Sequence, residues 1–361
     1  MTLHEGIYNF SSGPACLPLS VLEDIKKDIP DWHSGMSVME VSHRSESFLS
    51  LKNRVETSIK QLLNIPDDFC ILLMHGGARM QFSAIGLNLF YQESVVNFLI
   101  TGHWSHDAFQ EASKYVSCHV AAHAEQNGYT MIPPYSDSDM SEQSKFLYYT
   151  DNETIHGIEF LAPPRTRLGL IADMTSSILT KKIDFEQHDL IYASAQKNLG
   201  IAGVTLVIVR KSLLGQAHPL TPSVLNYKIT AEKGSLYNTP PVFAIYVLDL
   251  ILEWVKTNGG LPACSDMANR RSNMLYNMID NSHFYQNKVS VEVRSRMNVP
   301  FSLPSPALES KFVLEAEQQG LMFLKGHRAV GGCRASLYNA MPEAGVAKLV
   351  TFMQQFESQN K

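Results

Sequence analysis

A series of short apolar runs between about residues 65 and 215 is the strongest constraint on the fold. Each run is apolar at consecutive positions, and helix-length segments such as RMQFSAIGLNLF and SHDAFQEASKY separate several of them. Strands of this kind are typical of a mostly parallel sheet that helices cover on both faces. The runs are CILLM at 70–74, SVVNFLI at 94–100, HVAAHA at 119–124, KFLYY at 145–149, LGLIAD at 168–173, DLIYAS at 189–194 and VTLVIV at 204–209. We therefore expect a large α/β domain.

The last third of the chain has a different pattern, which predicts a smaller α+β domain. Helices are expected over 242–256, about 262–279, 307–319 and 343–357, with strands in VSVEV, MNVPFSL, GLMFLKG and CRASLYN. The Asn258-Gly-Gly260 turn marks the expected domain boundary. This assigns residues 16–258 to the large domain, and residues 1–15 and 259–361 to the small one.

Charge and cysteine usage exclude several classes of partner. The net charge is −5 and no basic block exceeds two or three residues, which argues against a nucleic-acid partner. The five cysteines include no C-x-x-C pair, so neither a disulfide framework nor a zinc knuckle is expected. No signal-peptide pattern begins the sequence, and no apolar run is long enough to span a membrane. We expect a cytoplasmic protein without a membrane partner.

Lys197 and Asp173 are the first candidate functional residues. Lys197 follows the predicted strand DLIYAS, and Asp173 ends the predicted strand LGLIAD. Open α/β sheets bind their ligands at the carboxyl ends of such strands. An enzyme that uses pyridoxal phosphate needs a lysine to bind the coenzyme and a carboxylate to keep its ring nitrogen protonated. The same two residues could equally form a salt bridge, and Lys197 alone could simply extend to water.

Two further stretches could belong to the same site. His75-Gly-Gly-Ala-Arg-Met-Gln-Phe82 lies between a predicted strand and a predicted helix, where backbone N–H groups can bind a phosphate. It matches neither common nucleotide-binding fingerprint, and a Gly-Gly pair is often only a turn. Trp104 follows the next strand and could stack on a flat ring or lie in the core.

Several long and unusual strings are spread over essentially the whole chain. They are SSGPACLP, SVMEVSHR, HGGARMQF, TDNETIHGI, IADMTSSIL, IYASAQKNLG, YNTPP, SRMNVPF, LKGHRAVGG and CRASLYNAMP. In these strings the chain resembles the phosphoserine aminotransferases, which belong to the class V aminotransferases and have the type I pyridoxal phosphate fold. The resemblance implies the α/β type I fold, with a large domain built on a mostly parallel mixed sheet and a smaller C-terminal domain.

By this resemblance, Lys197 is the Schiff-base lysine and Asp173 pairs with the pyridine nitrogen, so these two are the catalytic residues. Trp104 would stack on the cofactor ring, and Thr154 would hydrogen-bond its hydroxyl. Contacts to the cofactor phosphate would come from Ala78, Arg79 and Gln196 of the same chain. Asn238 and Thr239 would reach the phosphate in a neighbouring subunit, which implies a homodimer with shared active sites. Ala78 stands where relatives often have glycine, a change of little consequence because the backbone amide makes the contact.

The reaction that the resemblance implies is amino transfer between glutamate and 3-phosphohydroxypyruvate, giving O-phosphoserine in serine biosynthesis. Both substrates carry two anionic ends, for which arginine is a suitable partner. Arg334 would bind the shared α-carboxylate, and Ser12 would also contact substrate. The pairs His43-Arg44 and His327-Arg328 would take the phosphate or the distal carboxylate, if the small domain folds over the large one. Whether the chain also acts in vitamin B6 synthesis is left open.

Other interpretations remain at this stage. The pairs His103/His106 and His119/His123 have spacings that zinc sites use. However, the first pair is expected to straddle a strand-to-helix turn and the second lies in a probable strand, where the two residues share a face at most loosely, so no metal is predicted. The chain could be another class V enzyme with a different amino donor, such as a desulfurase that uses Cys333. It could also be a non-catalytic ligand-binding protein with the same fold.

Overall fold

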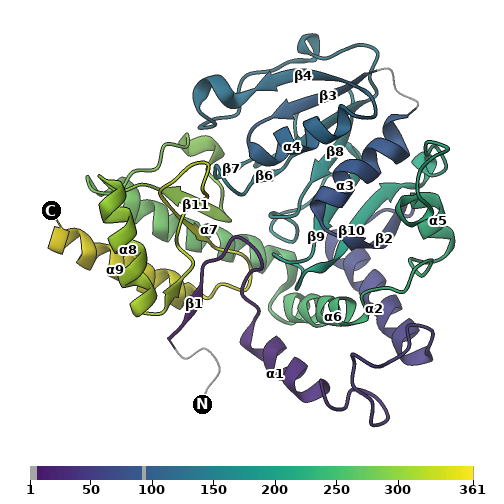
Figure 1. The fold of residues 1–361 in the computed structure, drawn as a ribbon, viewed down its shortest axis with the longest axis horizontal. Coiled ribbons are helices and arrows are strands. Elements are labelled where there is room, and N and C mark those ends of the chain that lie inside the picture. Colours follow the sequence, from purple (N-terminus) through teal and green to yellow (C-terminus); the bar gives the residue numbers. More distant parts are fainter. Residues whose placement is uncertain (1–5, 92–94, 361) are drawn as a thin grey trace.

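The computed structural model describes residues 6–91 and 95–360, and its central element is a seven-stranded sheet (Figure 1). The strand order is β2-β10-β9-β8-β5-β3-β4. Strand β10 runs antiparallel to its neighbours β2 and β9, whereas the other neighbouring strands are parallel. The prediction of a mostly parallel sheet is therefore confirmed. The strands are β2 (Phe69–Gly76), β3 (Val95–Ile100), β4 (Ser117–His123), β5 (Phe146–Thr150), β8 (Gly169–Asp173), β9 (His188–Ser194) and β10 (Gly203–Arg210). Ser94, in the run predicted over 94–100, lies outside the described residues.

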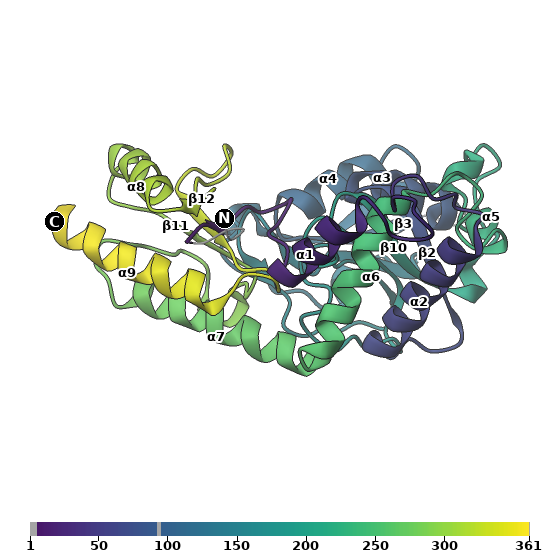
Figure 2. The ribbon, with the colours of Figure 1, turned by 90° about the horizontal axis from the view of Figure 1, so that it is seen from below.

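The strands are apolar at consecutive positions because the sheet has a core on each face. Neighbouring residues of a strand point to opposite faces. Leu72 accordingly packs with helices α3 and α4, whereas Leu73 packs with α2 and α6. Tyr148 and Tyr149 in β5 divide in the same way. One layer contains α3 (Ala78–Ile85), continued by a π-helical turn to Phe90, α4 (His103–Ala112) and α5 (Tyr227–Glu232). The other layer contains α1 (Leu19–Asp28), α2 (Glu46–Leu63) and α6 (Val242–Thr257) (Figure 2).

The C-terminal residues form a second lobe, which Figure 2 shows beside the sheet and its helices. Phe10, Phe312 and Phe352 belong to a core of its own. The N-terminal strand β1 (Tyr8–Asn9) pairs in parallel with β12 (Leu321–Met322), so the first described residues belong to this lobe. Its other elements are α7 (Gly260–Asp280), β11 (Asn298–Phe301), α8 (Pro306–Gln318), β13 (Cys333–Ser336) and α9 (Glu343–Asn360). A separate core is consistent with two domains. The exact boundary near residue 258 stays a prediction.

One predicted strand is wrong. Residues Val291–Val293 of VSVEV form a short 3-10 turn, and Val291 is 72% exposed. Ser290 donates one backbone hydrogen bond to Thr130, but no ladder follows. β-branched residues favour a strand only where a neighbouring strand is available to pair with them.

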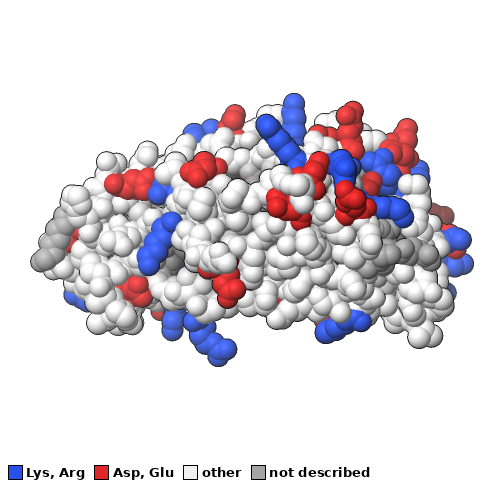
Figure 3. All heavy atoms as spheres, turned by 90° about the horizontal axis from the view of Figure 1, so that it is seen from above, with Lys and Arg blue, Asp and Glu red and all other residues white. Residues whose placement is uncertain are grey.

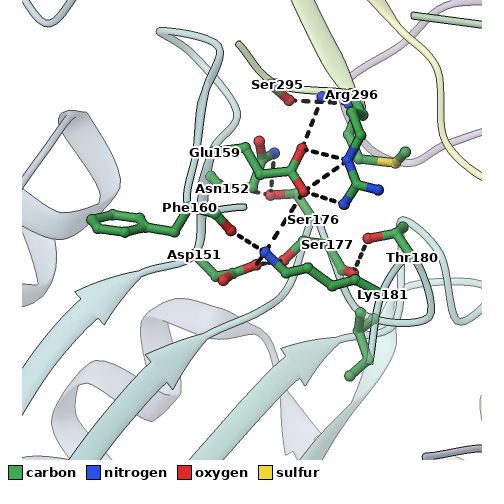
Figure 4. Close-up of polar contacts among 12 residues, drawn as sticks. Asp151, Asn152, Glu159, Phe160, Ser176, Ser177, Thr180, Lys181, Ser295 and Arg296 are labelled. Carbon is green, nitrogen blue, oxygen red and sulfur yellow. Dashed lines mark hydrogen bonds and ion pairs between the residues drawn. The ribbon is translucent and has the colours of Figure 1, made fainter. Parts of the chain in front are cut away.

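A buried ionic cluster joins the two lobes at the carboxyl ends of the strands (Figure 4). Glu159 belongs to a small hairpin of β6 (Asn152–Glu153) and β7 (Ile158–Glu159), which directly follows β5. Its Oε1 accepts a 2.6 Å hydrogen bond from Nη2 of Arg296, which precedes β11. Lys181 lies 2.9 Å from Asp151 and 3.7 Å from Glu159. Two acids and two bases thus compensate one another out of water.

On the face that Figure 3 shows, acidic and basic side chains are interspersed, without a large patch of one sign. Within residues 6–91 and 95–360, no helix is both long and apolar enough to cross a membrane.

Candidate active site

A cavity of about 190 Å³ lies where strands β5 and β8 and the turn after β9 meet the second lobe. Asp173 ends β8, Thr150 ends β5, and Lys197 lies just beyond β9. Parallel strands place their carboxyl ends at one edge, which brings together residues far apart in sequence. The lining residues are Ser12, Gly13, Ala78, Trp104, Thr150, Asn152, Thr154, Ile155, Asp173, Thr175, Ser176, Gln196, Lys197, His327 and Arg334.

The amine of Lys197 points into this cavity and donates a 2.6 Å hydrogen bond to Oγ1 of Thr154. Burial lowers the pKa of Lys197 to about 8, and the positive charge of Arg334 also lowers it, whereas Asp173 acts in the opposite direction. A depressed pKa gives a lysine more of the neutral, nucleophilic form. Gly13 lies beside this side chain with a φ of +136°, a backbone conformation that other residues rarely adopt, whereas a Cβ there would make only an ordinary 3.5 Å contact with Lys197.

The carboxylate of Asp173 is held from two sides. Its Oδ1 accepts a 2.8 Å bond from the backbone N–H of Thr175, and its Oδ2 accepts a 2.9 Å bond from the Tyr192 hydroxyl. Burial raises the pKa of Asp173, while these hydrogen bonds and Lys197 lower it. Sequence reasoning missed Tyr192 and Thr175. The available signal was a tyrosine inside the apolar run that leads to Lys197.

Trp104 forms one wall of the cavity from the first turn of α4. Its indole Nε1 is buried without a hydrogen-bond partner among the described residues. The Arg79 guanidinium lies 5.2 Å from the centre of the indole ring and forms a 2.7 Å ion pair with Asp107. The Arg79 side chain is therefore exposed and does not line the cavity, whereas its neighbour Ala78 does.

The second lobe contributes Arg334 from β13 and His327 from the preceding loop. Arg334 is only 9% exposed, and its Nη2 donates a 2.6 Å bond to Oγ of Ser12. Its Nη1 lies 3.4 Å from the carbonyl oxygen of Thr154. The ring of His327 stands 5.7 Å from that of His103. The cavity thus has a cationic side that faces Lys197.

Five other residues with an expected role do not line the cavity of this chain. His43 and Arg44 lie in the loop between α1 and α2, and Arg328 is exposed beside His327. Asn238 and Thr239 are exposed next to β2, where the Thr239 carbonyl oxygen lies 2.6 Å from Nε2 of His75. The expectation that folding of the small domain would bring His43 and Arg44 to His327 and Arg328 finds no support within one chain.

The histidine pairs form no metal site in the described residues. His103 and His106 both belong to α4, so the expected turn between them is wrong. The ring of His106 stacks on that of His123 with 6.2 Å between the ring centres. Residues 6–91 and 95–360 contain no group of three His, Cys, Asp or Glu placed to hold a metal ion.

The cavity fits a flat, polar cofactor such as pyridoxal phosphate. It combines an aromatic wall, a carboxylate with a fixed orientation and a lysine whose pKa is depressed. Two of its lining groups, Oγ1 of Thr150 and Oδ1 of Asn152, are buried without partners in the described structure. Buried polar atoms normally have a partner, so these atoms indicate a polar ligand.

Comparisons with known proteins agree with this geometry. The sequence model of the class V aminotransferase family matches residues 7–349. Among curated relatives, the phosphoserine aminotransferase of Laribacter hongkongensis is 47% identical over 97% of this chain and 98% of its own length. Phosphoserine aminotransferase 1, chloroplastic, of Arabidopsis thaliana is 45% identical over 99% of this chain and 84% of its own.

Solved structures give the same result. The phosphoserine aminotransferase from Bacillus circulans subsp. alkalophilus has a TM-score of 0.94 and 40% identity, covering 98% of this chain and 99% of that one. The pyridoxal-phosphate-bound phosphoserine aminotransferase from Trichomonas vaginalis has a TM-score of 0.91 and 38% identity, with coverages of 96% and 99%. The type I aminotransferase fold expected from the sequence is confirmed.

Proposed function

This chain belongs to the class V aminotransferases, and we propose that it acts there as a phosphoserine aminotransferase. The reaction is reversible amino transfer between glutamate and 3-phosphohydroxypyruvate, which yields O-phosphoserine and 2-oxoglutarate. The protein is a transaminase that uses pyridoxal phosphate. The observation that carries the proposal is the meeting of Lys197, Asp173 and Arg334 in one cavity, together with relatives of this name over nearly the full length.

Each residue of the cofactor pocket has a proposed role. Lys197 binds the cofactor covalently, Asp173 keeps the proton on its ring nitrogen, and Trp104 packs against its ring. Thr154 donates to the ring hydroxyl. Ala78 and Gln196, together with the backbone of Arg79 at the start of α3, hold the phosphate, because a helix N-terminus favours an anion. When bound, the protonated ring withdraws electrons from the α-carbon of the substrate.

The chemistry of the chain's own residues centres on one nitrogen atom. Once a substrate amine had replaced it, Nζ of Lys197 would be free to accept the proton of the substrate α-carbon as a base and to give it back as an acid. Its depressed pKa suits both directions near neutral pH. Asp173 keeps its charge opposite the ring throughout, supported by its two hydrogen-bond donors.

Substrate binding follows from the cations at the second lobe. Arg334, oriented by Ser12, binds the α-carboxylate that all substrates share. His327 and Arg328 bind the distal phosphate or carboxylate. His43, Arg44, Asn238 and Thr239 do not line their own cavity, so we propose that they complete the cavity of a second copy in a homodimer. This arrangement explains why they are partly or fully exposed in one chain.

The alternatives receive less support. A desulfurase needs a reactive thiolate on a mobile loop, but Cys333 is 1% exposed in strand β13, and burial raises its pKa to about 12. A non-catalytic binding protein would have no need of a lysine whose pKa is lowered beside a buried carboxylate. The vitamin B6 step and the cytoplasmic location stay predictions.

The test uses the purified protein. It should absorb near the visible edge as a yellow holoenzyme, change that absorption with glutamate, and be labelled at Lys197 after borohydride reduction. Amino transfer to 2-oxoglutarate should be much faster from O-phosphoserine than from alanine. Equal rates with both donors would contradict the phosphorylated substrate, and a colourless protein whose cofactor content is unchanged in Lys197→Ala would contradict the enzyme.

A further inference from the structure

Glu153 is a fully buried acid that lies directly behind the cavity wall and has no role in the scheme above. It is 0% exposed and belongs to β6. Its Oε1 accepts hydrogen bonds of 2.8 Å from the backbone N–H and 2.7 Å from the hydroxyl of Ser105. Its Oε2 accepts a 3.1 Å bond from the backbone N–H of Trp104. These contacts hold the first turn of α4 from a distant part of the chain.

The first N–H groups of a helix have no partner inside the helix. The residue at the cap of α4 is Gly102, which has no side chain to accept from them. Glu153 takes this part instead, and its negative charge also suits the helix N-terminus. Trp104 and Ser105 are therefore held to β6 through their backbone N–H groups, while the Ser105 hydroxyl also accepts from the backbone N–H groups of Thr101 and Gly102 in the preceding loop.

The close approach of the two segments requires a glycine. A Cβ on Gly102 would lie 2.4 Å from Cδ of Glu153, nearer than van der Waals contact permits. The φ of Gly102 is −179°, an extended value that any residue adopts, so the requirement is for space alone. The absence of a side chain at Gly102 thus makes the space that the Glu153 carboxylate occupies.

Both segments that Glu153 joins, the start of α4 and β6, contribute a residue to the cavity wall. Trp104 lines the cavity as its aromatic wall, and Thr154, the residue after Glu153, lines it beside the amine of Lys197. We propose that Glu153 is a positioning residue, which fixes Trp104 relative to Thr154 and Lys197 and so sets the slot for the cofactor ring. The proposal rests on the proposed function, in which Trp104 packs against that ring.

A carboxylate suits this position better than its amide. Three donors point at the two oxygens of Glu153, whereas a glutamine would offer one oxygen and turn its own N–H groups toward another donor. Burial raises the pKa of Glu153 to about 7, although its three hydrogen bonds lower it, so the charged form that suits the start of α4 predominates above about neutral pH. Replacement by glutamine should leave the Trp104 or Ser105 N–H unpaired and let the first turn of α4 move.

The test measures the cofactor itself in Glu153→Gln. The dissociation constant of pyridoxal phosphate from the apoprotein should rise by about ten-fold, and the induced circular dichroism of the bound cofactor should fall. Ser105→Ala keeps both backbone donors to Glu153 but removes the acceptor of the Thr101 and Gly102 N–H groups, so it should weaken cofactor binding less than Glu153→Gln does. Glu159→Gln is the matched control, because Glu159 is equally buried in the same hairpin but its carboxylate pairs with Arg296 and Lys181 instead of with α4. It should lower stability without changing the cofactor signal.

A double-mutant cycle decides whether Glu153 acts through Trp104. In a Trp104→Ala background, Glu153→Gln should have no further effect on cofactor affinity. Additive effects, or an unchanged affinity and dichroism in a folded Glu153→Gln protein, would overturn the inference. If Glu153→Gln does not fold, Gly102→Ala gives the same measurement, because its methyl group pushes the retained carboxylate away. A wild-type protein that binds no pyridoxal phosphate would instead overturn the proposed function.

Discussion

The Tyr192 hydroxyl donates a 2.9 Å hydrogen bond to the carboxylate of Asp173, and the two residues are paired in neighbouring parallel strands β8 and β9. A second tyrosine continues the chain, since the Tyr148 hydroxyl lies 2.7 Å from that of Tyr192. All three side chains are buried. The strand register therefore places a donor next to the acid that the cofactor ring would meet.

We expect Tyr192→Phe to lower kcat by about ten-fold with little change in KM, because a hydrogen bond to a charged group typically stabilises it by about 1.5–3 kcal/mol. Without that donor the pKa of Asp173 rises further, and the ring nitrogen loses its proton more readily. Steady-state kinetics and the pH dependence of cofactor absorption measure this. Tyr148→Phe keeps the direct bond and should have a smaller effect. Equal losses in the two variants would contradict the role of Tyr192.

Capture of added pyridoxal phosphate by the apoprotein should depend on the pKa of Lys197, which burial lowers to about 8. Only the neutral amine reacts, so the rate should rise about ten-fold per pH unit below that value and level off above it. Stopped-flow absorbance gives the profile. Arg334→Met removes a positive charge that lowers this pKa, so its midpoint should move to higher pH. A wild-type midpoint near the ordinary lysine pKa of 10.5 would show that burial does not lower the pKa of Lys197.

Ser12→Ala should raise KM for glutamate and for O-phosphoserine by the same factor, about three- to ten-fold, because the hydroxyl holds the guanidinium that binds their common carboxylate. Arg334→Lys should affect both substrates more strongly, since a lysine cannot make the paired contacts of an arginine. Arg328→Ala is the comparison, with a larger loss for O-phosphoserine than for glutamate. A Ser12 effect confined to one substrate would argue against this assignment.

The buried pair of Glu159 and Arg296 should contribute to stability (Figure 4). Arg296→Met removes the guanidinium from Glu159, which keeps the backbone N–H of residue 296 at 2.9 Å and Lys181 at 3.7 Å, and should lower the free energy of unfolding by about 3 kcal/mol. Chemical denaturation measures it. The double variant Arg296→Met/Glu159→Leu should recover part of the loss, because no unpaired charge remains. If the double variant is less stable than Arg296→Met, the unpaired carboxylate of Glu159 is not the cause of the loss in stability.

Hybrid dimers test whether Arg44 serves a second copy. Lys197→Ala and Arg44→Ala should each be nearly inactive alone. Mixed under conditions that exchange subunits, they should regain activity, because one of the two cavities in a hybrid then has both an intact Lys197 and an intact Arg44. Activity is assayed before and after exchange, with each variant exchanged against itself as the control. No regain in verified hybrids would place Arg44 outside the shared site.

Local sequence was sufficient for the sheet and for its two most informative side chains. Consecutive apolar residues predict strands with a core on each face, and the ends of those strands placed Asp173 and Lys197 at one edge. The prediction of a strand at VSVEV was wrong for a related reason. β-branched residues favour the strand conformation, but a strand forms only if a neighbouring strand is present to pair with it.

The supporting contacts were decided by tertiary structure. Tyr192 looked like one more apolar strand residue, and Glu153 like a polar residue in a loop, until strand register and the packing of α4 on β6 gave each its partner. Ser12 and Arg334, which lie at opposite ends of the chain, were expected only from the family resemblance, and β1 and β13 bring them within 2.6 Å. Periodicity along a chain reports which face a side chain occupies. The identity of its neighbour depends on how distant segments align, and that alignment is set by the packing of the whole core.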